Sequence, residues 1–342
     1  MAPRHPLSLL PLLTPCRQRR MDPITHTLVG ASVARAVPAG RTPLAMAACV
    51  IGANLPDVDV ASFVAGGAFP FAFRRGWTHG ALAVVVLPFA LTGLLLAWDR
   101  VVRRRRDPAA PPAVARRLLP LAAIAVLTHP LLDLLNVYGI RLLMPFDDTW
   151  FYGDVLFIAD PWLWAVLGLG LWLGRRADTG GRTDGHRGRR PVQVALALAV
   201  AYIVLMAASA AGARYVVRRA MPFARAGVER LMVGPDPVTP FRKWVVIDEG
   251  GGYRVGEFDW LRTPKIRYED LVYLPAGGDG PAAAAARQAA EGRWFLSWAR
   301  FPFFRAEGDA ADTTRRVHII DARYALEASA RFGALTVEVA AP

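Results

Sequence analysis

Long apolar runs, separated by short polar or arginine-rich segments, dominate the first two thirds of the chain. Six such runs follow one another: 26–37, 43–54, 79–98, 118–135, 161–173 and 192–217. A helix that crosses a bilayer needs about 20 apolar residues, so the first two runs are short and three of the later ones are long enough. The pattern predicts an all-α polytopic membrane core of about five or six helices.

Residues 222–342 have a different pattern, in which short aromatic and β-branched segments alternate with Gly, Pro and Asp turns. Such segments are typical of strands. We expect strands at 243–247, 252–256, 293–298, 316–320 and 334–339, and an Ala-rich helix near 281–291. The sequence therefore predicts a membrane domain at 21–217 followed by a small β-rich soluble domain at 222–342. Residues 1–20 are interpreted as an N-terminal extension, with Met21 as the natural start.

The charge distribution predicts how the chain crosses the membrane. The chain has 342 residues, is 54% hydrophobic and carries a net charge of +13. Seven arginines lie in 100–117 and six in 175–190, and arginine-rich loops stay in the cytoplasm. Threading from there places 60–78, 136–160 and the C-terminal domain on the outer side. The first of these segments begins with a Gly- and aromatic-rich loop predicted at 60–73. The arginine runs lack interleaved aromatic residues, which disfavours a nucleic-acid partner. The two cysteines are far apart and predict neither a disulfide framework nor a thiolate metal site.

The polar residues within the apolar runs indicate a metal site. His129 and Asp133 are four residues apart on an apolar helix, so both side chains project from one face and can bind a single cation. Without such a partner, a buried imidazole and carboxylate would be costly. His26, Asp57 and His79 stand at other helix ends, and the threading places all five at the same membrane face.

Imidazole and carboxylate ligands without thiolate suit Zn²⁺ above all, with Mn²⁺ or Fe²⁺ as alternatives, and the groups suffice for one or two ions. Asp59 and Asp154 are candidates for the catalytic base or for a carboxylate that orients a histidine. Arg75 and Trp77 are candidates for binding an anionic substrate, or they anchor the chain at the interface. The alternatives for the others are an interfacial His26, an Asp57 that caps a turn, and a solvated Asp59.

Five motifs lie in order between residues 21 and 165: MDPITHTLVG, ANLPDVD, RRGWTHG, THPLLDLLNVYG and FYGD followed by DP. In this order they resemble the YdjM-type family of bacterial inner-membrane proteins, which are assigned as metal-dependent hydrolases. The SWARFP segment in the tail is similar to longer members. The resemblance implies a multi-pass protein of the bacterial inner membrane, and in such a membrane the outer side predicted above for the site and the C-terminal domain is the periplasmic side.

The order His, Asp, His and HxxxD is also similar to the first half of the zinc site in bacterial zinc-dependent phospholipase C and P1-type nucleases. These are all-helical enzymes that cleave phosphodiesters. The similarity implies these ligands: His26, Asp57 or Asp59, His79, His129 and Asp133. This chain departs from the pattern after Asp133, because only Asp154 and Asp160 follow. We therefore expect one or two metal ions instead of a three-zinc cluster.

The function that follows is metal-dependent hydrolysis, in which a metal-activated water attacks an ester or phosphodiester. The expected partners are membrane lipid and a small-molecule or lipid ester substrate. A second hypothesis is a non-catalytic metal-stabilised scaffold or partner-binding protein with a closed site. Transport of a divalent cation is disfavoured, because the carboxylates gather at one face instead of at several depths.

Overall fold

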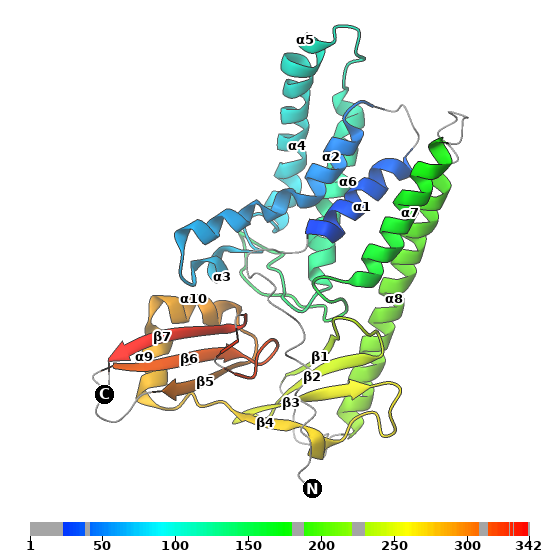
Figure 1. Cartoon of the computed structure of the whole chain (residues 1–342). Coiled ribbons are helices and arrows are strands. Elements are labelled where there is room, and N and C mark those ends of the chain that lie inside the picture. The colour runs from blue at the N-terminus through cyan, green and yellow to red at the C-terminus, as the bar shows by residue number, and fades with distance from the viewer. Residues whose placement is uncertain are drawn as a thin grey trace.

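The structure is a computed structural model that describes residues 23–37, 42–179, 188–220, 230–307, 314–327, 329–330 and 332–340. The predicted N-terminal extension lies outside these residues. The described chain folds into a helical bundle, and two small antiparallel sheets lie at one end of it (Figure 1).

The helical part follows the predicted apolar runs. Its elements are α1 (Pro23–Ala36), α2 (Ala45–Asn54), η2 (Leu55–Ala65), α3 (Phe69–Phe73), α4 (Ala81–Trp98), η3 (Asp99–Arg103), α5 (Arg104–Arg106), α6 (Ala115–Leu134), α7 (Pro161–Thr179) and α8 (Arg189–Ala220). Among the described residues, four segments are long and apolar enough to cross a membrane: Ala45–Ala65, Ala81–Arg106, Ala115–Leu134 and Arg189–Ala220. The predicted helical membrane core is confirmed.

The segment after Asn54 differs from the prediction. A loop was expected at 60–73, but a 3₁₀ helix, η2, continues directly from α2 to Ala65, and α3 follows. Pro56 lies in the first turn of η2, where its missing N–H costs no hydrogen bond and its fixed φ suits a helix. The proline therefore begins a new helical segment and turns Asp57 and Asp59 toward the bundle.

The helices of the bundle approach each other closely where residues are small. Gly30 of α1 faces the backbone of α2, and a Cβ at this position would lie 2.5 Å from the carbonyl oxygen of Cys49. Cys49 and Ala53 of α2 are fully buried and pack with Leu121 and Ala125 of α6. This close packing brings the polar residues of three helices within reach of one another.

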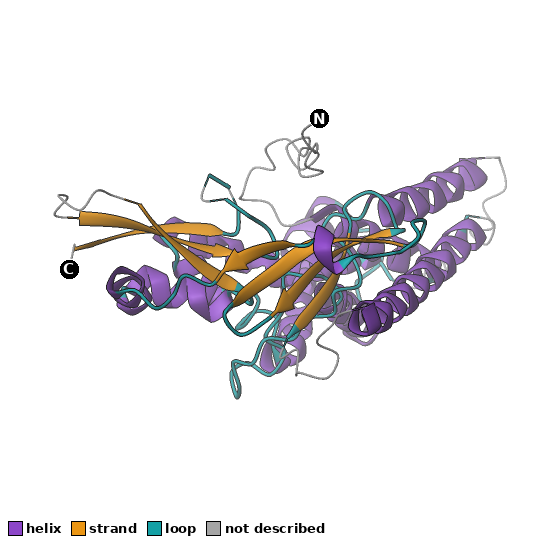
Figure 2. Ribbon diagram, turned by 90° about the horizontal axis from the view of Figure 1, so that it is seen from below, coloured by secondary structure: helices purple, strands orange, loops and turns teal. Residues whose placement is uncertain are grey.

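The C-terminal part contains two sheets. Strands β1 (Leu231–Pro235), β2 (Arg242–Asp248), β3 (Gly252–Asp259) and β4 (Val272–Pro275) form the first, in that order, and β5 (Pro302–Glu307), β6 (Thr314–Asp321) and β7 (Ala334–Ala340) form the second. The short helix η4 (Tyr268–Asp270) lies between β3 and β4, and α9 (Pro281–Gln288) and α10 (Ala290–Trp298) connect the two sheets. Seen from below, the sheets lie next to each other in front of the helices (Figure 2). The predicted β-rich domain is confirmed.

The strand predicted at 293–298 is wrong, because these residues form most of α10. The aromatic composition suggested a strand, but the residues that are buried are Gly292, Phe295 and Trp298. Their spacing of three places them on one face of a helix, whereas a strand would bury every second residue.

Two contacts fix the C-terminal part against the bundle. The last turns of α8 pack Ala213 and Val217 against Val245 and Phe258 of the first sheet. On the other side, Phe71 of α3 lies with its ring centroid 4.9 Å from that of Trp298 in α10. The sheets are therefore anchored to the end of the bundle by two separate hydrophobic contacts.

The contact at Gly30 generates a test of helix packing. Gly30→Ala is expected to destabilise the protein by about 1–3 kcal/mol, because the new methyl group would overlap the Cys49 carbonyl. Gly93→Ala in α4 is the matched control: nothing lies within 4 Å of its added Cβ, and the change favours the helix by up to about 1 kcal/mol. Thermal unfolding in detergent measures both, and a loss of similar size in the two variants would contradict the proposed packing.

Candidate metal centre

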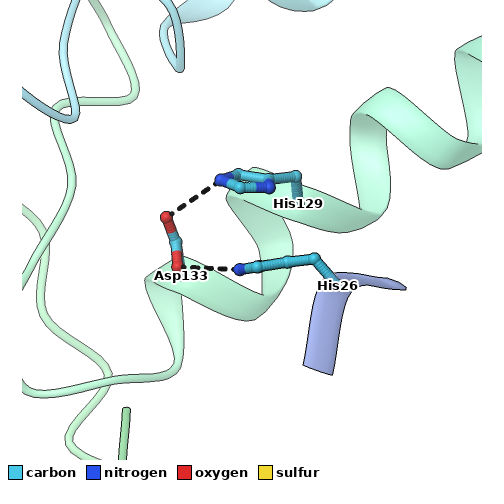
Figure 3. A group of neighbouring side chains, drawn as sticks. All are labelled: His26, His129 and Asp133. Atoms are coloured by element: carbon cyan, nitrogen blue, oxygen red, sulfur yellow. Dashed lines mark ion pairs between the residues drawn. The ribbon is translucent and has the colours of Figure 1, made fainter. Parts of the chain in front are cut away.

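The five predicted ligands lie together at the end of the bundle that faces the C-terminal domain. His129 and Asp133 come from α6, His26 from α1 and Asp57 from η2, while His79 precedes α4. Figure 3 shows His26 and His129 pointing toward the carboxylate of Asp133 from two helices. His79 and His129 are fully buried, and the side chain of Asp57 is 15% exposed. Burial of this many ionisable groups is costly unless they share a charge.

The two buried histidines face each other through nitrogens that carry lone pairs. Nδ1 of His129 lies 2.7 Å from the carbonyl oxygen of Ala53, which can only accept, so this nitrogen carries the proton. Nδ1 of His79 lies 2.9 Å from the hydroxyl oxygen of Thr78, and that hydroxyl donates to Asp59 at 3.3 Å. The Thr78 oxygen therefore accepts from His79, and Nδ1 carries the proton here too. The two Nε2 atoms are 3.1 Å apart. Two lone pairs at this separation repel unless a cation lies between them.

Two carboxylate oxygens complete the set. Oδ2 of Asp133 lies 3.4 Å from Nε2 of both His79 and His129. Oδ1 of Asp57 lies 3.8 Å and 3.7 Å from the same two nitrogens. Both oxygens are buried and accept no hydrogen bond from the described residues. Ligand atoms around a tetrahedral Zn²⁺ with bonds of about 2.0–2.1 Å are about 3.3 Å apart, so the donors of His79, His129 and Asp133 fit one divalent ion, and Asp57 lies somewhat farther from the two histidines.

A second ion at the same centre is disfavoured by charge. The other oxygen of Asp133, Oδ1, lies 3.0 Å from the guanidinium of Arg75 and 3.3 Å from the amide nitrogen of Asn136. A positive group thus already occupies the position that a second cation would take. The two groups of possible ligands, His26–His129–Asp133 and Asp57–His79–His129, also share His129, which has only one nitrogen left to bind a metal.

His26 borders the centre on the far side of Asp133. Its ring stacks on His129 with centroids 3.8 Å apart, and its Nε2 lies 3.6 Å from Asp133 Oδ1. A cavity of about 20 Å³ adjoins it, lined also by Asp133, Asn136 and Asp160, which is room for about one water molecule. Asp160 itself accepts hydrogen bonds from the amides of residues 162 and 163, so it is the N-cap of α7.

Asp59 lies behind His79 and holds the turn that carries it. Its Oδ2 accepts a hydrogen bond of 2.8 Å from the backbone N–H of Arg75, and its Oδ1 lies 3.3 Å from Nε of Arg74. Arg75 has a φ of 52°, a left-handed conformation that is costly for a residue with a side chain. The buried carboxylate stabilises this turn and orients the His79 ring, which is the role of a positioning residue.

The two residues predicted to bind substrate lie in different environments. Arg75 is 1% exposed, and its guanidinium contacts Asp133, Asn136 and the carbonyl oxygen of Gly139. It therefore neutralises the centre from within the protein. Trp77 is 54% exposed, so its side chain lies at the surface two residues before His79.

The structure does not bring Asp154 to the histidines. Its carboxylate is buried between Arg214 of α8, at 3.1 Å, and Arg300 of the C-terminal domain, whose Nη1 lies 3.1 Å and 3.0 Å from the two oxygens. Asp154 thus joins three parts of the chain, at a φ of 55°.

Sequence reasoning missed two residues of the site. Asn136 was overlooked, although its place three residues after Asp133 near the end of a helix was a usable signal. Arg74 was not among the predicted site residues either. It is buried beside Asp57 and Asp59, with Nη2 3.9 Å from Oδ1 of Asp57.

Comparison with known proteins supports the motif reading. The sequence profile of the YdjM inner membrane protein family matches residues 21–213. The chain is also 22% identical to the uncharacterized protein YfhP of Bacillus subtilis (strain 168) over 332 residues, which cover 89% of this chain and 87% of YfhP. No solved structure matches the chain. The similarity to phospholipase C and P1-type nucleases thus rests on the order of the motifs alone.

The contacts of Asp154 generate a test of its role. Asp154→Asn removes the charge between Arg214 and Arg300 but tolerates the left-handed backbone, so we expect a loss of about 1–3 kcal/mol in stability. Bound metal is expected to remain at the wild-type level, because Asp154 contacts none of the proposed ligands. Thermal unfolding and elemental analysis of the same preparation measure both effects, and loss of metal with unchanged stability would make Asp154 part of the centre.

Proposed function

Because the chain belongs to the YdjM inner membrane protein family, we propose that it is a membrane-bound metal-dependent hydrolase with one divalent ion. The observation that carries the proposal is the pair of Nε2 atoms of His79 and His129, 3.1 Å apart and flanked by two buried carboxylate oxygens. Zn²⁺ fits this set of nitrogen and oxygen donors and their spacing best, and Mn²⁺ or Fe²⁺ suits the same donor types.

Each residue has a distinct task in this proposal. His79, His129, Asp133 and Asp57 hold the ion, and Asp59 fixes the tautomer and orientation of His79. A divalent ion held by these residues would supply Lewis acidity and a nucleophile from water near neutral pH. Of the two carboxylate donors, Asp57 has the more exposed side chain. The reacting ester is therefore expected to approach from the side of Asp57, whose carboxylate can accept a proton there.

The substrate class that fits the opening is a lipid or other amphiphilic ester or phosphodiester. Val58 and Trp77, next to Asp57 and close to His79 in sequence, are 52% and 54% exposed. Exposed apolar side chains at the level where the helices end favour a substrate with an apolar part. Arg74 lies behind Asp57 and places a positive charge near the negative charge that would develop on the ester during hydrolysis.

We also propose that the site and the C-terminal domain lie on the periplasmic side. The described arginine-rich ends, 100–106 and 116–117, and 175–176 and 189–190, lie at the end of the bundle remote from the sheets (Figure 1). By the positive-inside rule that end is cytoplasmic. Alkaline phosphatase, which is active only after export, is expected to be active when fused after residue 340 and inactive when fused in the 100–117 segment; the reverse pattern would overturn the orientation.

A second function is favoured by one observation. Four protein donors surround the proposed ion, and a tetrahedral ion with four protein ligands has no position left for water. In that case the centre would stabilise a non-catalytic scaffold or partner-binding protein. The greater distances of Asp57 from the two histidines, 3.7–3.8 Å against 3.4 Å for Asp133, favour the catalytic alternative, in which Asp57 gives way to water or substrate.

Elemental analysis with a hydrolysis assay tests the proposal. Wild-type protein purified without chelators is expected to contain about one Zn, Mn or Fe per chain and to cleave lipid phosphodiesters or esters in mixed micelles. His129→Ala is expected to lose the metal and at least about 100-fold in activity. His318→Ala is the matched control, because His318 hydrogen-bonds Thr336 in the second sheet and leaves the centre untouched.

The outcomes separate the two functions. Metal at one ion per chain without hydrolysis of any micellar or soluble ester would favour the scaffold, and folded wild-type protein without metal would overturn both.

A further inference from the structure

The short segment after α6, residues 136–139, accepts hydrogen bonds from arginines on two sides. On the side of the metal centre, Arg75 donates to the side-chain oxygen of Asn136 at 2.9 Å and to the carbonyl oxygen of Gly139 at 3.2 Å. On the opposite side, Arg323 of the C-terminal domain donates to the carbonyl oxygens of Val137 and Tyr138, at 2.9 Å and 3.3 Å. One segment thus connects the centre with a residue almost two hundred positions away.

Arg323 is held rigidly for this contact. It is 5% exposed and forms an ion pair of 2.8 Å with Asp321, which is fully buried at the end of β6. Its other terminal nitrogen group also donates to the carbonyl oxygen of Trp298 at the end of α10. A planar guanidinium with five donors can bind a carboxylate and several carbonyl groups at once, which a lysine cannot do.

Tyr138 connects the segment held by Arg323 with the residues around the metal centre. Its ring lies under the guanidinium of Arg75, 4.6 Å from the ring centroid, and packs on Trp298 at 5.0 Å. Its backbone N–H also donates to Asn136 at 2.9 Å. Arg75 and Asn136 in turn both bond Oδ1 of Asp133, whose other oxygen faces the two histidines. Every step in this chain is a direct contact between buried groups.

We propose that Arg323 is a positioning residue of the metal centre, so that the C-terminal domain is part of the site. It fixes Tyr138 and residues 136–139, these fix Arg75 and Asn136, and these hold the carboxylate of Asp133 in its ligating orientation. The inference rests on the proposed metal function but concerns a different property, the dependence of the centre on a residue of the sheet domain.

Arg300 provides a matched comparison. It also reaches from the C-terminal domain to the loop after α6, but its side chain binds Asp154 instead of residues 136–139. Arg323→Lys and Arg300→Lys are thus the same chemical change in the same domain, and only the first touches the path to Asp133. Arg323→Lys also keeps a positive charge beside Asp321, which favours a folded variant.

The experiment measures Zn²⁺ affinity of the full-length protein by competition with a chelator. Arg323→Lys is expected to weaken binding about tenfold, in the range of residues that orient a ligand from behind. Tyr138→Leu, which removes the ring beneath Arg75, is expected to weaken it similarly, whereas Arg300→Lys should stay within about twofold of wild type. Equal losses in the two Arg→Lys variants, or none in Arg323→Lys and Tyr138→Leu, would overturn the proposal.

A second measurement does not depend on metal. Hydrogen exchange of the amides of residues 134–139 in chelator-treated protein is expected to speed up in Arg323→Lys and to stay unchanged in Arg300→Lys. If wild-type protein binds no metal, the proposed function fails, and this comparison still decides whether Arg323 holds the segment. Unchanged exchange in both variants would overturn the inference independently of the metal.

Discussion

The structure depends on a compensation of charge inside an apolar bundle. Two imidazoles, two carboxylates and a guanidinium gather where residues from η2, α6 and the segment before α4 meet, and four of the five side chains are at most 5% exposed. When the Nδ1 atoms carry the protons, the two Nε2 lone pairs that face each other at 3.1 Å do not attract. A shared cation would turn this repulsion into binding energy, because both lone pairs and the buried carboxylate oxygens would then have a partner.

The rest of the helical part keeps these groups in place. Small residues in α1 and α2 allow the helices to approach, so that the Ala53 carbonyl reaches His129 across the interface. Pro56 starts η2 and directs two acids inward, and the left-handed turn at Arg75 brings His79 back toward them. A strained backbone is retained because the Asp59 carboxylate pairs with the turn and with the histidine that follows.

The C-terminal domain is part of the same arrangement. It is attached through apolar contacts of α8 and α3, through Asp154 between two arginines, and through Arg323 on the segment after α6. The contacts of Asp154 and Arg323 are buried and polar, and such contacts require specific distances and angles. Apolar packing attaches the domain, whereas the arginines determine its orientation relative to the centre.

The sequence by itself determined the membrane-spanning helices, the β-rich tail and the identity of the five clustered residues. Apolar run length and the four-residue spacing of His129 and Asp133 are local properties, and the motifs carried the family. What the sequence could not decide depends on contacts between distant residues: that 293–298 is a helix, that Asp154 pairs with Arg214 and Arg300, and that Arg75 is buried. The sequence around an arginine can be the same whether its side chain lies at a membrane surface or beside a buried acid. Only tertiary structure, by setting which charges share a low-dielectric interior, decides between them.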